Sequence, residues 1–309
     1  GNRRVGLLAA TFAGIAYWPN VITRVALRFT LYPAFIAPAL YYLIRGIHRS
    51  NRNDFILAGI ALGLGLHGYS PFRVAPLLIV LGVLLSLLHQ KSQQFRKNNL
   101  TGLAIIALVS SIIFLPLLRF WFDDPSLFSY RTITRLGSLE QPLPGDPLAI
   151  FLSNLWKAVI MFFWDNGEVW PISVTHRPAL DVISAALFFL GIGLILVRYL
   201  RQRHWQDLLW IISIPILMLP SVLSLAFPAE NPILNRTAGA IIPVFLIVGI
   251  ALDSLMAGIE TRIAPAWGSK LAWGLAILLV FGSCQLNYQL VFEEYQRSYE
   301  LSAWNTSEM

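Results

Sequence analysis

Charged residues are scarce in this chain of 309 residues. Asp, Glu, Lys and Arg make up 13% of it, whereas hydrophobic residues make up 56%, and the mean hydropathy is +0.64. A soluble domain carries about 25% charged residues, so a surface wholly exposed to water is excluded. Cysteine is nearly absent as well. The single residue, Cys284, excludes an internal disulfide and a thiolate metal cluster.

The motifs of soluble enzymes are also missing. The sequence contains no glycine-rich nucleotide-binding loop, no HExxH zinc motif and no GxSxG nucleophile motif. Its five histidines are not grouped at metal-ligand spacing. The net charge of +7 does not indicate a nucleic-acid partner, because the basic residues follow membrane sidedness instead. Ionisable residues are nearly absent from the centres of the apolar runs, which argues against an ion-coupled carrier.

Apolar runs long enough to cross a bilayer are abundant. A span needs roughly 20 mostly apolar residues, and fewer where flanking side chains reach the interface. We therefore predict an all-α fold, a polytopic transmembrane helical bundle that forms a single domain over residues 1–309. The nine predicted spans cover residues 5–19, 30–46, 55–69, 74–89, 100–119, 181–199, 208–227, 239–256 and 271–288.

The basic residues predict the orientation of these spans. If the N-terminus lies in the cytoplasm, the short basic loops 46–54, 90–99 and 200–207 all fall on the cytoplasmic side, as the positive-inside tendency requires. Most acidic residues then fall on the outer side. We expect an integral membrane protein whose neighbours are membrane lipids and whose outer face carries the functional groups.

One connection, residues 120–180, is long and is predicted to be extracytoplasmic. Loops of this length without structure of their own are uncommon unless they are functional. We interpret its apolar segment 148–164, which includes Asn154, as an amphipathic helix in the outer interface. The alternative is a re-entrant or tenth spanning helix, which would place a basic loop outside. Residues 289–309 form a predicted extracytoplasmic tail.

Four arginines lie at predicted outer helix ends: Arg24, Arg28, Arg73 and Arg236. Arg24 and Arg28 are spaced i and i+4, so on a continuous helix they would share one face and meet the same anion. Guanidinium groups bind phosphate oxygens in a bidentate way, and the set therefore predicts a phosphate site on the outer face. Each arginine could instead anchor a helix to lipid headgroups by snorkelling.

A second group of outer residues could contact a sugar or a divalent cation. Two carboxylates follow a predicted span directly, and two others lie between tryptophans. Aromatic rings beside carboxylates can hold sugars, although tryptophan at an interface is also typical of the ordinary aromatic belt. Carboxylate oxygens are common ligands of divalent cations. A histidine such as His176 could titrate near neutrality, or it could be an ordinary hydrogen-bonding loop residue. The candidates are Asp123, Asp124, Asp165, Glu168, His176 and Tyr69.

Several segments resemble the multi-span GT-C glycosyltransferases. In these enzymes a basic helix start is followed by an outer turn of the Ser-Arg-x-x-x-Arg kind. The segment 3–10 resembles the helix start, and the segment 18–28 resembles the turn, with Thr23 in place of the serine. The run 58–65, which leads into Tyr69-Ser70-Pro71-Phe72-Arg73, resembles the next outer turn, and Asn235-Arg236 through Pro243 resembles a late span start. The likeness is to the bacterial family 39-like enzymes, relatives of protein O-mannosyltransferases and lipid A aminoarabinose transferases, over residues 1 to about 256.

The resemblance implies a GT-C helical bundle in a bacterial plasma membrane. Such enzymes are hexosyltransferases that take a sugar from a polyprenyl-phosphate donor on the outer face and pass it to a lipid, glycan or protein acceptor. A divalent cation, Mg²⁺ or Mn²⁺, is the one cofactor expected. Their acidic general base or metal partner lies in the first outer loop, which here would precede Gly1. The catalytic residue is therefore unknown, and we expect the natural protein to carry further spans before this chain.

Two other classes of function stay open. A flippase or other transporter of lipid-linked glycans would need a polar path through the bilayer, which the apolar runs do not favour. A non-catalytic membrane assembly protein is the second alternative.

Overall fold

The computed structural model describes residues 2–90, 92–137 and 140–302, and within them the chain forms helices and turns but no strand. Apolar segments favour helices in lipid because a helix satisfies its backbone hydrogen bonds internally. The elements in chain order are α1 (Arg3–Ile15), α2 (Tyr17–Arg24), η1 (Arg28–Thr30), α3 (Leu31–Arg49), α4 (Arg52–His67), η2 (Ser70–Val74), α5 (Ala75–His89), α6 (Gln93–Asp123), α7 (Pro125–Leu136), α8 (Pro147–Ile160), η3 (Trp170–Ile172), α9 (Val182–Gln202), α10 (Trp205–Val222), η4 (Pro228–Glu230), η5 (Ala238–Ala240), α11 (Ile241–Arg262), α12 (Pro265–Tyr288), the π-helical η6 (Gln289–Glu294) and α13 (Tyr295–Ser302).

Each of the nine predicted spans falls largely on one helix. Six helices of the described chain are long and apolar enough to cross a membrane, or seven if the bent pair α1–α2 counts as one span. The predicted spans 30–46 and 55–69 correspond to α3 and α4, which are not among these six; α4 has 16 residues. The helices are those of an integral membrane protein, and the count of nine spans stays a prediction.

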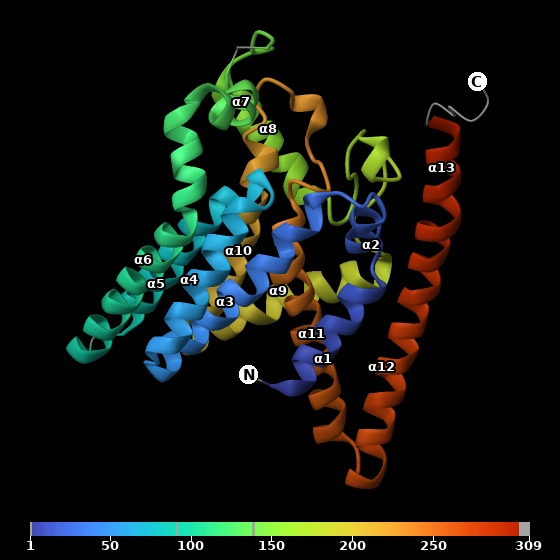
Figure 1. Cartoon of the computed structure of the whole chain (residues 1–309). Coiled ribbons are helices and arrows are strands. Elements are labelled where there is room, and N and C mark those ends of the chain that lie inside the picture. Colours follow the sequence, from blue (N-terminus) through green and yellow to red (C-terminus); the bar gives the residue numbers. More distant parts are fainter. Residues whose placement is uncertain (1, 91, 138–139, 303–309) are drawn as a thin grey trace.

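Figure 1 shows α7 and α8 at one end of the bundle, which we call the α7 end, and the α11–α12 turn at the other. The first predicted span bends by 52° between α1 and α2, where Ala16 is extended. The side-chain amide of Asn20 donates to the carbonyl oxygens of Gly14 and Ala16 at this bend. Trp18 is fully buried and donates from Nε1 to the Leu234 carbonyl oxygen at 2.9 Å, which anchors α2 to the segment before α11.

The long connection 120–180 contains more helix than its sequence predicts. The helix α8 matches the predicted apolar segment 148–164, but α7 lies in a polar stretch for which no helix was predicted. Leu148, Leu152 and Trp156 are exposed on α8, whereas Asn154 is fully buried. An exposed apolar stripe of this kind is suited to contact with lipid.

The predicted tail 289–309 begins as a continuation of the last span. From Trp267 to Ser302 the chain is one helical rod, in which α12 passes through the π-helical η6 into α13 (Figure 1). Residues 303–309 lie outside the described part of the chain. The tail is therefore helical from Gln289 to Ser302, and its sidedness stays a prediction.

Two turns at the opposite end of the bundle are built alike. The α3–α4 turn has Ser50 in the left-handed region and the α9–α10 turn has Arg203 there. In both turns an arginine nine residues before an aspartate pairs with it across the hairpin. The pairs are Arg45 with Asp54 and Arg198 with Asp207, each with an Nε–Oδ distance of 2.8 Å. Both aspartates are buried, so each pair closes its helical hairpin with a carboxylate that is shielded from solvent.

Candidate functional site

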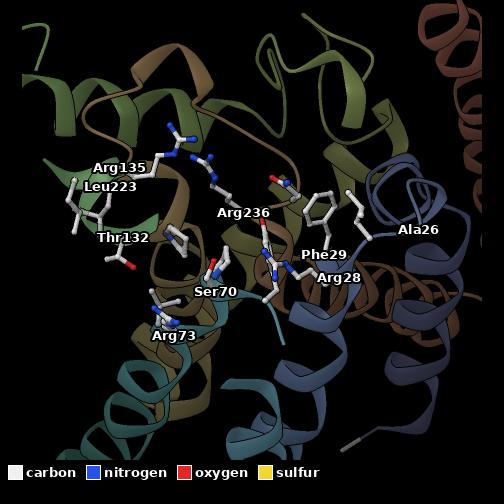
Figure 2. A pocket seen from close by; sticks show the side chains of 16 residues that line it. Ala26, Arg28, Phe29, Ser70, Arg73, Thr132, Arg135, Leu223 and Arg236 are labelled. Carbon is white, nitrogen blue, oxygen red and sulfur yellow. The ribbon is translucent and has the colours of Figure 1, made fainter. Parts of the chain in front are cut away.

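A cavity of about 780 Å³ lies at the α7 end of the bundle (Figure 2). Four segments far apart in sequence form its walls: the turn between α2 and η1, the short helix η2, the helix α7, and the chain between α10 and α11. A cavity of this size is in the range of small-molecule sites. Its described lining residues are Ala26, Leu27, Arg28, Phe29, Tyr69, Ser70, Pro71, Arg73, Val74, Thr132, Arg135, Leu136, Pro220, Leu223, Asn235 and Arg236.

The turn between α2 and η1 corrects one expectation from the sequence. The helix α2 ends at Arg24, Ala26 has a φ of 54°, and Leu27 is extended before η1 begins at Arg28. Arg24 and Arg28 are therefore not on one continuous helix face. The break turns Arg28 toward the cavity and leaves Arg24 outside it, because a left-handed residue between the two changes the direction of the chain.

Arg28 and Arg73 enter the cavity from separate elements. Arg28 is exposed and makes no hydrogen bond or ion pair with any described residue. Arg73, on η2, is half-buried; its guanidinium lies 4.0 Å from the centroid of the Phe128 ring and donates to the Phe128 carbonyl oxygen at 3.3 Å. Its Nε is buried and has no hydrogen-bond partner among the described residues. Neither arginine has an acidic partner, so both positive charges stay available for an anion.

Arg135 and Arg236 lie together on the other side of the cavity (Figure 2). Arg236 Nη2 donates to Glu230 Oε2 at 2.6 Å, and its Nη1 donates to Ser224 Oγ at 3.1 Å. Arg135, near the C-terminal end of α7, lies 3.4 Å from Glu230 Oε1 and stacks over the Phe227 ring at 4.0 Å. The carboxylate of Glu230 therefore forms ion pairs with two guanidinium groups.

The cavity has an excess of positive charge. Four of its described lining residues are arginines and none is acidic, while Glu230 lies beside two of them and not in the lining. The side-chain oxygen Oδ1 of Asn235 is buried without a partner among the described residues, and Tyr69 also lines the wall. Convergent guanidinium groups in a partly apolar cavity are suited to an oxyanion, above all a phosphate.

Arg24, predicted to join the phosphate site, lies instead at a smaller cavity of about 300 Å³ beside α13. Its Nη1 donates to the Val291 carbonyl oxygen in the π-helical η6. Its guanidinium lies 5.2 Å from the Phe292 ring centroid and 5.7 Å from that of Tyr295. Arg24 therefore joins α2 to the last helical rod.

Asp123 and Asp124 lie at the junction of α6 and α7. Asp123 is largely exposed and forms a 3.7 Å ion pair with Arg119, which is also exposed. Asp124 caps α7: it accepts from the Leu127 backbone N–H at 3.0 Å and from the Ser126 hydroxyl at 2.6 Å. These two donors hold the pKa of Asp124 below its ordinary value. Neither carboxylate lines the cavity.

Asp165, Glu168 and His176 lie in the segment between α8 and α9. Asp165 accepts from the Gly167 backbone N–H at 2.7 Å and faces His176 Nδ1 at 3.3 Å, while Glu168 is exposed. No group of three or more His, Cys, Asp or Glu residues able to hold a metal ion occurs in the described part of the chain. The predicted carboxylates thus do not form a divalent-cation site by themselves.

The structure thus brings together Arg28, Arg73, Arg236 and Tyr69 from the predicted set and adds Arg135. The sequence does not identify Arg135 as a site residue, because its segment is polar and gives no prediction of the helix α7. Comparisons with protein-family models, curated proteins and solved structures find no match to this chain.

Proposed function

We propose that this protein is a membrane glycosyltransferase of the GT-C kind that uses a polyprenyl-phosphate sugar donor. The observation that carries the proposal is the cavity at the α7 end, where four arginines from four segments meet without an acidic lining residue. The cavity receives the donor phosphate, and the sugar passes to a lipid, glycan or protein acceptor. The resemblance of the turns that contain Arg28, Arg73 and Arg236 to GT-C turns supports the same conclusion.

The chemistry gives these arginines a role in the transition state. During transfer, an acceptor oxygen forms a bond to the sugar C1 while the bond from C1 to the phosphate oxygen breaks. Negative charge then grows on the departing lipid phosphate, and the acceptor proton passes to a base. Fixed guanidinium groups stabilise the growing charge without reorganisation, which lowers the barrier. No described residue is assigned as the base.

The position of the cavity supports a lipid-linked donor. It lies at one end of the bundle, where the headgroup region of a bilayer would surround it, so a phosphate could enter while its polyprenyl chain stays in the hydrocarbon core. The short basic turns after α3 and α9 lie away from the α7 end and favour the cytoplasmic side for their own end. We therefore propose that the cavity faces the extracytoplasmic side.

Sugar transfer by the purified full-length gene product tests this proposal. Radiolabelled polyprenyl-phosphate sugars are offered in detergent micelles together with membrane lipid and glycan acceptors. Removing one donor to a developing oxyanion costs about 10²–10³ in turnover, so Arg28→Ala and Arg73→Ala should each lose transfer on that scale. Arg119→Ala is the matched control, because Arg119 is an exposed arginine paired only with exposed Asp123.

Two results would overturn the proposal. The first is equal transfer by folded wild type, Arg28→Ala and Arg73→Ala. The second is the absence of transfer from any donor by a well-folded full-length protein. Movement of the labelled lipid across proteoliposome membranes in that case would favour the transporter.

A further inference from the structure

Glu230, the last residue of η4, is held between two arginines of the cavity. Its Oε2 lies 2.6 Å from Arg236 Nη2 and its Oε1 lies 3.4 Å from Arg135 Nη1. The three side chains are 31%, 16% and 20% exposed, respectively, so the bridge is partly shielded from water. It joins α7, which carries Arg135, to the chain between α10 and α11, which carries Glu230 and Arg236.

The bridge leaves part of Arg135 unsatisfied. Arg135 Nη1 is buried and has no hydrogen-bond partner among the described residues, since Glu230 at 3.4 Å and Glu140 at 3.9 Å provide ion pairs without hydrogen-bond geometry. A buried donor without an acceptor is unfavourable. An oxyanion with more oxygens than a carboxylate could bind Arg236 and also fill this donor.

We propose that Arg135 and Arg236 form an oxyanion subsite whose resident carboxylate, Glu230, is displaced by a phosphate group of the ligand. The bound carboxylate marks a position that both guanidinium groups reach. A phosphate offers three oxygens in place of two and carries the charge that the rest of the cavity favours. The identification of this phosphate with that of a lipid-linked donor rests on the proposed function. The binding of a phosphate at the subsite does not.

Displacement has a measurable consequence. Glu230 must leave the subsite before the phosphate binds. The apparent affinity is therefore the intrinsic affinity multiplied by the fraction of molecules in which the subsite is open. Removing the charge of Glu230 should therefore tighten phosphate binding. If Glu230 instead positions Arg236 for the ligand, the same change should weaken binding. The sign of the effect distinguishes the two roles.

The experiment is calorimetric titration of the full chain in an uncharged detergent with dodecyl phosphate and with inorganic phosphate. Glu230→Gln should bind dodecyl phosphate about tenfold more tightly than wild type. Glu294→Gln is the matched control, because Glu294 pairs with Arg177 at 3.3 Å outside the cavity, and its affinity should equal that of wild type. Tighter binding of dodecyl phosphate than of inorganic phosphate identifies a lipid-linked ligand, and the reverse order identifies free phosphate.

A double-mutant cycle locates the effect. In an Arg135→Ala background the gain from Glu230→Gln should disappear, since the subsite has lost one of its two cations. Unchanged or weaker binding by folded Glu230→Gln would overturn the subsite, as would a gain that persists without Arg135. If Glu230→Gln does not fold, Glu230→Asp replaces it, because aspartate keeps the charge but is too short to reach Arg135 as well. Glu230→Asp should bind dodecyl phosphate severalfold more tightly than wild type. An unchanged affinity would overturn the subsite. None of these readouts needs sugar transfer, so a protein that binds in this way but transfers no sugar would refute the glycosyltransferase alone.

Discussion

The guanidinium of Arg73 lies over the ring of Phe128, 4.0 Å from its centroid, and donates to the carbonyl oxygen of the same residue. This contact joins η2, at the start of the candidate span Ser70–His89, to the first turn of α7. The other end of α7 is held by Arg135 through Glu230 and by the Ala226 backbone N–H, which donates to the Arg135 carbonyl oxygen at 3.1 Å. The helix α7 therefore forms a wall of the cavity that is attached at two points.

Phe128→Ala should loosen this wall. Loss of a cation–π contact worth about 1 kcal/mol should speed amide exchange in residues 125–136 about fivefold, because local opening becomes less costly. Hydrogen-exchange mass spectrometry measures the effect. Phe281→Ala is the control, since Phe281 is exposed on α12, and it should leave residues 125–136 unchanged. Equal exchange of α7 in both variants would contradict the contact.

Close packing of α9 against α11 depends on a single glycine. A Cβ at Gly191 would lie 2.6 Å from the Ile247 carbonyl oxygen, whereas a Cβ at Gly193, on the same helix, would have no heavy atom within 4 Å. Gly191→Ala should destabilise the protein by about 1–3 kcal/mol through overpacking. Gly193→Ala should be neutral or slightly stabilising, because alanine favours helix. Thermal unfolding in detergent measures both, and matched midpoints would contradict the close approach.

The two Arg–Asp pairs of the hairpin turns should contribute far more to the stability of the fold than exposed ion pairs do. Asp207→Asn removes a carboxylate that is 2% exposed and leaves Arg198 without its partner, which should cost about 2 kcal/mol, since Arg198 is still 41% exposed to solvent. Asp123→Asn breaks a pair of exposed side chains and should cost less than about 0.5 kcal/mol. A smaller loss for Asp207→Asn than for Asp123→Asn, measured by thermal unfolding, would refute this ranking.

The cap of α7 should be sensitive to acid. The Leu127 N–H and the Ser126 hydroxyl lower the pKa of Asp124 in the folded state. A carboxyl with a lowered folded pKa stabilises its structure above its ordinary value of about 3.9, and the stabilisation is lost as the pH falls through the lowered pKa. Exchange in residues 125–136 should thus rise in acid relative to Asp124→Asn, because asparagine caps the helix at every pH. Parallel pH profiles for the two proteins would argue against the cap.

Helix positions could be predicted well from the sequence, because long apolar runs have few other stable forms in lipid. The helix α7 could not, since its sequence is polar and its stability comes from contacts such as Arg73 with Phe128. A local signal existed: Asp124-Pro125 and Asp146-Pro147 place an N-cap aspartate before a proline at the first helical position, and both start helices.

The candidate site was partly predictable for a related reason. Arginines at helix ends can be recognised one at a time, but the cavity depends on how distant segments meet. The left-handed Ala26 separates Arg24 from Arg28, and alanine gives no warning of such a turn. The two hairpins share a sequence signal, an arginine nine residues before an aspartate at a helix boundary. The signal alone does not predict the pairing, because the pairing depends on the left-handed turn between the two helices.

Photolabelling tests most directly whether the arginine cavity binds a lipid phosphate. A polyprenyl phosphate with a photoreactive group beside the phosphate is bound to the full-length protein in nanodiscs, crosslinked and mapped by mass spectrometry. Label should concentrate in residues 26–29, 69–74, 132–136 and 235–236, fall at least tenfold in Arg28→Ala, and persist in Arg119→Ala. Label spread over the lipid-facing surface of α12, with no difference between the two variants, would contradict the proposed site.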